Sequence, residues 1–241
     1  MNLQQHKQEI EEKGFSIINN VFTHEHVAVL VEAIEQADNS SANFRKTTGL
    51  YAIRRFLNEV PAVAPIIFQP SFIAMINELV GSDYFVVKSI YFDKPEGSNW
   101  FVSYHQDLTI SVSNKLEIQG FGPWTVKQEQ YAVQPPLAIL QSNITFRIHL
   151  DDANENNGAL HVIPGSHLRG IYRPETIDHN EEQETICNVS RGSVMIMKPL
   201  LLHASGRTTN NQKRRVIHIE LSNQSLPDGL TWAELLLLCT N

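Results

Sequence analysis

Two histidines and one aspartate stand where β-strands could bring their side chains together. His105 and Asp107 are two residues apart, and alternate residues of a strand point to the same face, so one ion could contact both. His203 follows the apolar run 193–197 and a short loop, which predicts a strand that ends in this histidine. Two histidines and a carboxylate on one side of a metal are typical of non-haem Fe(II) oxygenases. An isolated His-x-Asp triplet can equally be an exposed strand end.

A second candidate position is Arg214, the first residue of an alternating stretch. Arg214 shares one face with His218 and Glu220, whereas the opposite face is apolar after Arg215. Arg214 is therefore predicted to line a cavity, where its planar guanidinium suits bidentate capture of a carboxylate. The alternative is a surface strand whose charges lie in water.

The stretch 137–151 also alternates, and we expect one strand there. Its apolar residues from Ile144 to Leu150 form one face, and Thr145, Arg147 and His149 form the other. Polar residues that alternate with so regular an apolar set are expected to line a wet or ligand-filled interior. The alternative is a sheet with one solvent-exposed face.

Separate motifs agree in order and approximate spacing with one known family: residues 105–107 (His-Gln-Asp), 157–160 (Asn-Gly-Ala-Leu) with 163–167 (Ile-Pro-Gly-Ser-His), 203–206 (His-Ala-Ser-Gly) and Arg214. From about residue 88 to residue 221 the chain resembles the phytanoyl-CoA dioxygenase family. Its members are Fe(II)- and 2-oxoglutarate-dependent oxygenases. The resemblance implies an all-β core with flanking helices, folded as a double-stranded β-helix: a jelly-roll, cupin-like barrel.

The resemblance also assigns roles to individual residues. His105, Asp107 and His203 are implied to bind Fe(II). Arg214 is implied to pair with the distal carboxylate of 2-oxoglutarate, and the hydroxyl of Ser205 to help hold it.

The remaining predicted contacts are Lys88 and Thr145 for the cosubstrate, and Arg147, Gln141 and His149 for the substrate. The resemblance places strand 84–93 along the cosubstrate pocket, so Lys88 either faces a carboxylate or extends to solvent. Arg147 stands where relatives often have an aromatic residue. Because an unpaired buried charge is costly and Arg214 already serves the cosubstrate, Arg147 is predicted to bind an anionic group of the substrate.

We therefore expect an Fe(II)- and 2-oxoglutarate-dependent dioxygenase that uses O2 to hydroxylate a small, anionic organic substrate, with no catalytic side chain beyond the metal centre. Asp107 argues against halogenation, because halogenating relatives replace this ligand with a small residue. A cupin-like isomerase or a non-catalytic binding protein is the alternative. A zinc hydrolase would need a general base, and no Glu adjoins a ligand in sequence.

Composition limits the class of protein. The 241 residues, 42% of them apolar, predict one domain over 1–241, with a helical N-terminal third (about 1–82) packed on the barrel. A formal net charge of −7 argues against a nucleic-acid partner. Cys187 and Cys239 show no zinc-type spacing and fit a reduced, cytoplasmic compartment. No apolar run is long enough to span a membrane, and the oligomeric state is not predicted.

The expected elements can be given as ranges. Helices are predicted over 3–13, from the N-cap Thr23 to about 37, over 61–68, and over 71–80 with Ser71 as N-cap. Strands are predicted over 15–18, 84–93 and 159–163, and long loops over 38–48 and 111–136. The other histidines are expected to be structural or exposed: His24, His26, His161, His167 and His179.

Overall fold

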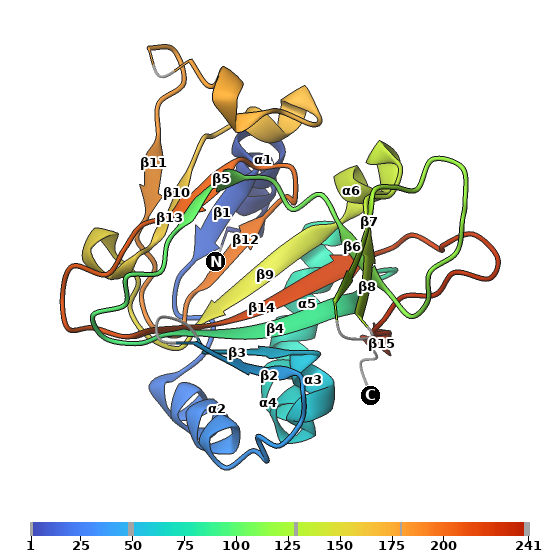
Figure 1. Ribbon diagram of the computed structural model, residues 1–241. Helices are drawn as coiled ribbons and strands as arrows, with labels where there is room; N and C mark the ends of the chain where they lie inside the picture. Colours follow the sequence, from blue (N-terminus) through green and yellow to red (C-terminus); the bar gives the residue numbers. More distant parts are fainter. Residues whose placement is uncertain (1, 48–50, 128–129, 179, 239–241) are drawn as a thin grey trace.

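The computed structural model describes residues 2–47, 51–127, 130–178 and 180–238. Within these ranges three β-sheets form the body of the molecule, and most of the helices lie along one side of the largest sheet (Figure 1). The prediction of a β-rich core with flanking helices is confirmed. Cys239 and His179 lie outside the described residues.

The largest sheet is antiparallel and combines strands from both ends of the chain. Its path is β1 (Phe15–Ile18), β12 (Val194–Met197), β9 (Ile144–His149), β14 (Arg214–Ser222), β4 (Phe85–Lys94), β3 (Tyr51–Arg54) and β2 (Phe44–Lys46), with β15 (Leu236–Leu237) also beside β4. The alternation predicted for β9 and β14 is confirmed, because Phe146 and Ile219 belong to the main core, whereas Arg147 and His218 lie on the other face.

The N-terminal helices supply much of that core. The helices are α1 (Leu3–Lys13), α2 (His24–Glu35), α3 (Phe56–Glu59), α4 (Ala64–Ile67), α5 (Pro70–Val80) and α6 (Leu137–Ser142), with short 3-10 turns at η1 (Pro61–Val63), η2 (Glu155–Asn157), η3 (Ser166–Arg169) and η4 (Pro174–Thr176). α1 ends at Gly14, and α2 starts after Thr23, whose side chain accepts a hydrogen bond from the His26 amide, as predicted. Phe72 of α5 packs edge-on against Phe146 of β9.

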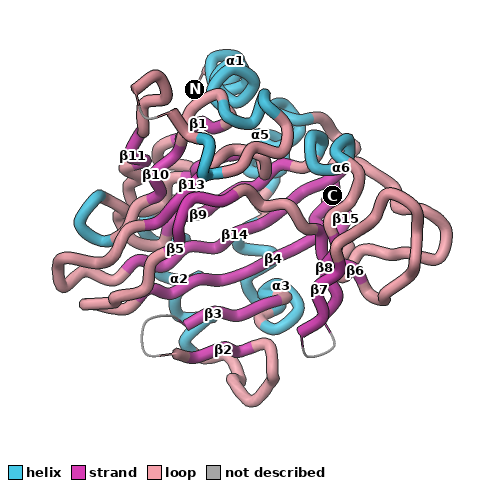
Figure 2. The backbone as a smooth tube through the Cα atoms, turned by 45° about the horizontal axis from the view of Figure 1, so that its top comes forward, coloured by secondary structure: helices cyan, strands magenta, loops and turns pink. Residues whose placement is uncertain are grey.

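A smaller sheet packs across the polar face of the large one. Its order is β11 (Thr185–Cys187), β10 (Leu160–Val162), β13 (His203–Ser205) and β5 (Val102–His105). Met195 and Met197 of β12 share a buried cluster with Leu160 and Val162, so the two sheets face each other (Figure 2). The pairing of the described strands leaves both sheets open rather than closed into a barrel.

Two of the predicted loops contain strands. Most of a three-stranded sheet falls within the range 111–136; its order is β6 (Ile110–Val112), β8 (Gln130–Val133) and β7 (Trp124–Lys127). Val112 of β6 and Val133 of β8 are buried in one cluster with Trp232, which stabilises these strands. The range 38–48 contains β2, which pairs with β3 at the edge of the large sheet.

Three predicted boundaries were also wrong. The stretch 137–151 is a short helix, α6, followed by β9, because Pro136 starts a helical turn that ends at Asn143. α5 begins at Pro70 with Gln69 as its N-cap, since proline is well tolerated in the first turn. The predicted helix 61–68 is split into η1 and α4.

No single helix in the described ranges is long and apolar enough to cross a membrane. The bent pair 61–67 and 70–80 reaches the required length and composition, but the apolar side chains of α5 are buried in the protein's own core.

The turn before β12 gives a test of this fold. Gly192 has φ +79°, and an added Cβ would lie 2.3 Å from the Phe22 carbonyl oxygen; Gly97 has φ +65° with open space around it. Alanine at either position should cost about 1–2 kcal/mol for the left-handed backbone. Gly192→Ala should cost roughly 1–3 kcal/mol more, because the backbone carbonyl must move. Urea unfolding of both variants measures the difference, and equal losses would contradict this packing.

Candidate metal centre

The backbone brings the three predicted ligands together. His105 is the last residue of β5 and His203 is the first residue of β13, and the two are register partners across that antiparallel pair. Asp107 follows β5, where its amide donates to the Pro199 carbonyl oxygen at 2.9 Å. One nitrogen from each imidazole and one oxygen of the carboxylate lie within 4.8 Å of one another. We call these three residues the triad.

Both imidazoles are held in the tautomer that a metal requires. Nδ1 of His105 lies 2.9 Å from the Ser103 carbonyl oxygen, and Nδ1 of His203 lies 2.9 Å from the Leu201 carbonyl oxygen. A carbonyl only accepts, so each Nδ1 carries the hydrogen and each Nε2 keeps a free lone pair. The Nε2 atoms lie 4.0 Å and 3.9 Å from the two Asp107 oxygens.

The protonation states of the triad also suit a metal. Burial lowers the pKa of the His203 imidazole to about 4, so this ring is neutral at pH 7. Burial raises the pKa of Asp107, but the charge that His203 gains once acid protonates it, together with the charge of Lys88, outweighs burial and holds that pKa below its ordinary value. The two imidazoles, of which His203 is neutral at pH 7, and the carboxylate are a donor set that fits Fe(II).

The triad opens onto a cavity of about 270 Å³ between the two sheets. Its far wall is basic: Lys94, Arg147 and Arg214 line it together with His218. Asp107 is the one acidic residue of this lining among the described residues. The cavity therefore suits an anion.

Arg214 lies where the sequence predicts it, deep in this wall and 4% exposed. Its Nη2 reaches the Ser205 hydroxyl at 3.4 Å, whereas Nε and Nη1 have no partner in the part of the chain that the structure describes. Burial lowers its pKa to about 9, and the charge of Arg147 adds to this effect. A buried guanidinium with unpaired donors is costly unless an anion completes it.

Lys94 is a site residue that our reading of the sequence missed. It is the register partner of Arg214 across β4 and β14, and it is fully buried. Its ammonium donates to the Gly206 carbonyl oxygen and lies 5.9 Å from the centre of the Trp100 ring. Burial lowers its pKa to about 8. Lys94 lies on the same face of β4 as Lys88, but one residue beyond the strand 84–93 that the sequence predicts.

Lys88, a predicted cosubstrate contact, is not among the described residues that line this cavity, and its contact to 2-oxoglutarate stays a prediction. Its ammonium lies 2.7 Å from Glu220, which also lies 3.0 Å from Nε2 of His218. Nδ1 of His218 is 3.1 Å from Nη1 of Arg147 and must accept from it, so Nε2 carries the hydrogen toward Glu220. A continuous chain of polar contacts thus runs from Arg147 through His218 and Glu220 to Lys88.

Of the other predicted contacts, only Ser205 is among the described residues that line the cavity. Thr145 and His149 are buried on the same strand face as Arg147, and their polar side-chain atoms have no partner among the described residues. Gln141 lies on helix α6 and outside the residues that line the cavity, because the chain is helical where we predicted a strand. Ser205 lines the cavity and donates to the Gly158 carbonyl oxygen.

The remaining histidines and Arg215 fall outside the site. His161 contacts Glu184, and His167 contacts the Glu11 carbonyl oxygen, in agreement with their predicted structural roles. Arg215 points to the opposite face of β14, where Nε and Nη2 each bind Asp151 at 2.8 Å.

Similar proteins carry related activities in their names. Ectoine dioxygenase of Bordetella bronchiseptica is 26% identical over 172 residues, which are 68% of this chain and 49% of that protein. The probable alpha-ketoglutarate-dependent hypophosphite dioxygenase of Stutzerimonas stutzeri is 24% identical, over 88% of this chain and 76% of its own. The chain thus spans about half the length of the ectoine dioxygenase.

Solved structures share the fold. The crystal structure of EctD from S. alaskensis with 2-oxoglutarate and 5-hydroxyectoine has a TM-score of 0.70 at 16% identity, covering 92% of this chain and 76% of that one. The alpha ketoglutarate dependent epimerase SnoN from nogalamycin biosynthesis has a TM-score of 0.71 at 15% identity, covering 99% and 98%.

The family model described as Phytanoyl-CoA dioxygenase (PhyH) matches residues 10–216. This range includes the triad, the three cations Lys94, Arg147 and Arg214, and every strand of the smaller sheet. The chain therefore belongs to the phytanoyl-CoA dioxygenase family.

Proposed function

We propose that this protein is an Fe(II)- and 2-oxoglutarate-dependent dioxygenase whose triad binds the iron. The observation that carries the proposal is Arg214: a buried guanidinium, with two unpartnered nitrogens among the described residues, in the same cavity as the triad. A metal site alone would not need such a group. A cupin-like isomerase or a binding protein without 2-oxoglutarate would leave this charge uncompensated.

The cavity wall matches the charge of 2-oxoglutarate. This dianion would bind iron through its keto acid end and reach the basic wall with its distal carboxylate. Arg214 and Lys94 are register partners, so the two cations can hold one carboxylate between them. Ser205, which contacts Nη2 of Arg214, orients the guanidinium. When bound, iron, 2-oxoglutarate and O2 together supply the oxidant, with succinate and CO2 as coproducts.

Arg147 extends the same wall. Its Nη1 is held by His218, its Nε has no partner among the described residues, and burial lowers its pKa to about 10. Arg147 and Arg214 line the same cavity, which favours a role for Arg147 in binding the cosubstrate rather than the substrate. A substrate contact, as predicted from the sequence, stays a prediction, and so do those of Gln141 and His149.

The order of strands supports the double-stranded β-helix predicted from the sequence. Along the chain, β9 lies in the large sheet, β10 in the small sheet, β12 in the large, β13 in the small and β14 in the large. We propose that the two facing sheets are the halves of this helix, within one domain over 1–241. The cytoplasmic location stays a prediction.

Hydroxylation of a small, anionic substrate is the outcome we propose. Hypophosphite, named for one relative, is a small oxyanion. SnoN is named an epimerase, so the fold itself does not fix the outcome. Succinate formation from 2-oxoglutarate with Fe(II) tests the dependence on 2-oxoglutarate. The gain of one oxygen atom in the product mass tests hydroxylation separately. No succinate under any condition would overturn the proposal.

The triad gives the first test of this function. Asp107→Ala and His203→Ala should each abolish Fe(II) binding in anaerobic titration, because each removes one of three protein ligands. Circular dichroism should be unchanged, since apolar residues hold the sheets. His161→Ala is the matched control, on neighbouring β10 and outside the cavity. Parent-like binding by either triad variant would refute the assignment.

Arg214→Lys tests the cosubstrate contact. The substitution keeps the charge but loses the forked pair of donors, and each charged hydrogen bond contributes about 1.5–3 kcal/mol. The apparent 2-oxoglutarate constant should therefore rise at least about tenfold, since about 1.4 kcal/mol is a factor of ten. Arg215→Lys, the same change on the opposite face, should leave it unaltered. Equal effects of the two variants would argue against the assignment.

Arg147→Leu separates cosubstrate from substrate. We expect the apparent 2-oxoglutarate constant to rise severalfold, because one of three cations facing the dianion is removed. The constant is measured from uncoupled succinate formation, with no substrate added. A parent-like constant, together with a lost response to small acids, would instead support the substrate contact predicted from the sequence.

A further inference from the structure

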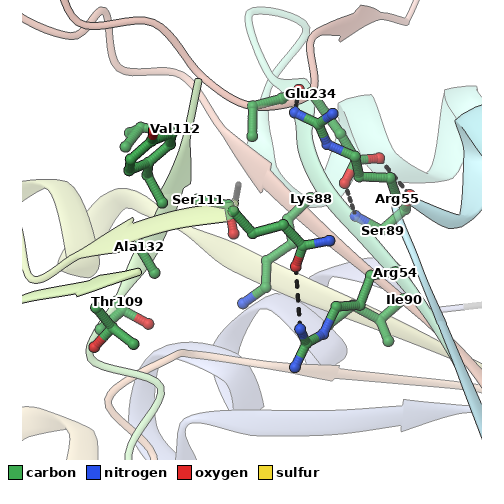
Figure 3. Close-up of a pocket in the computed structure, with 14 residues that line it drawn as sticks. Arg54, Arg55, Lys88, Ser89, Ile90, Thr109, Ser111, Val112, Ala132 and Glu234 are labelled. Carbon is green, nitrogen blue, oxygen red and sulfur yellow. Dashed lines mark hydrogen bonds between the residues drawn. The ribbon is translucent and has the colours of Figure 1, made fainter. Parts of the chain in front are cut away.

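A second cavity, of about 380 Å³, lies between the large sheet and the small three-stranded sheet. It is bounded by β3 and β4 on one side and by β6 and β8 on the other; Figure 3 shows Arg54 and Lys88 extending into it, opposite Thr109 and Ala132. We call it the chamber. Its volume is at the lower end of the roughly 300–1,000 Å³ of small-molecule pockets.

The chamber lies next to the cavity onto which the triad opens, which we call the iron cavity. Both are lined by residues on one face of β4. Lys88 and Ile90 line the chamber, and Phe92 and Lys94 line the iron cavity. Alternate residues of a strand are about 7 Å apart and point the same way. Thr109, two residues after the ligand Asp107, lines the chamber as well. A small molecule in the chamber would therefore have its near end beside the metal centre.

Of the three cations that line the chamber, only Lys88 forms an ion pair within the described residues. Lys88 is paired with Glu220 at 2.7 Å. Arg55 lies close enough to the buried Glu234 for its charge to act on that carboxyl group. Arg54 makes no ion pair with any residue in the described ranges; its side chain contacts the neutral amide of Gln130 at 3.2 Å.

The Arg54 guanidinium is held in place by a relay of side chains. The Gln130 oxygen accepts from Arg54, and its amide nitrogen donates to Asn43. Asn43 in turn donates to Glu59 at 2.6 Å. This relay fixes which end of the Gln130 amide faces Arg54. The relay engages Nη1 of Arg54 but brings no carboxylate to the guanidinium within the described residues.

We propose that the chamber is the substrate site and that it binds a small aliphatic carboxylate, with the carboxylate on Arg54 and the apolar body against Ile90, Val112 and Ala132. Arg54 makes no ion pair with a described residue, so its charge can pair with one carboxylate. Register places Arg54 directly opposite Ile90 on β4, so the anion is anchored beside the apolar part of the wall. The carbon to be oxidised would then lie at the Lys88 and Thr109 end. The proposal rests on the proposed function for its reaction but not for its binding.

Methyl NMR of the full-length protein with saturating 2-oxoglutarate tests the binding. The probes are 3-methylbutanoate and its neutral isostere 3-methylbutanamide. The methyl groups of Ile90 and Ala132 report on the chamber, and that of Ala204 reports on the iron cavity. We expect the acid to shift the chamber methyl groups and to bind at least tenfold more tightly than the amide. Equal affinities, or shifts confined to Ala204, would overturn the proposal without any variant.

Arg54→Gln should reduce the affinity for the acid to that for the amide and leave the amide unchanged. Arg54→Lys should give an intermediate affinity, because the charge remains while the Gln130 contact is lost. Arg45→Gln, an exposed arginine on β2, is the matched control and should behave like the parent. Parent-like binding of the acid by Arg54→Gln would overturn the proposal. Because these measurements need no iron, they are independent of whether the protein forms succinate.

Discussion

The pairing of β5 with β13 is the constraint on which the site depends. His105 and His203 lie almost one hundred residues apart in sequence, and this ladder makes them direct partners. A slip of one residue would turn one imidazole to the other face of the sheet, because the side-chain period of a strand is two. Ser205 lies two residues after His203 on β13, so ordinary alternation brings it to the same face, and it also lines the cavity. The two carbonyl contacts then fix both rings.

The site also depends on the large sheet having one apolar face and one charged face. The face toward α5 is apolar and carries the folding energy, with Phe146 and Ile219 in the main core. The face toward β13 collects charged groups that would be unfavourable in a core, Arg147 and Arg214 among them. The chain Arg147–His218–Glu220–Lys88 compensates part of this charge, and the remainder is what makes the cavity a site for anions.

The sequence was sufficient to predict the triad and Arg214, because period-two alternation is local and the family resemblance supplied their order. It was insufficient where tertiary packing overrides local pattern. Gln141 looked like a strand residue, yet Pro136 starts a helix there. The range 111–136 is rich in turn residues, but burial of Val112 and Val133 makes it a sheet. Lys94 was missed because β4 extends one residue beyond the predicted strand 84–93.

Arg54 shows a different limit of sequence reasoning. Arg54 belongs to no motif, and the proposed role of its charge depends on its neighbours. Lys88 is paired with Glu220, Glu234 lies beside Arg55, and Gln130, which contacts Arg54, is neutral. These contacts join β3, β4 and β8, and Arg54 and Gln130, for example, are 76 positions apart in sequence. The triad and Arg214 lie in the motifs by which the chain resembles its family, whereas the side chains that line the chamber lie outside those motifs. Selectivity for a substrate is therefore expected to reside in the chamber, where a change of residue alters what binds without altering the iron ligands.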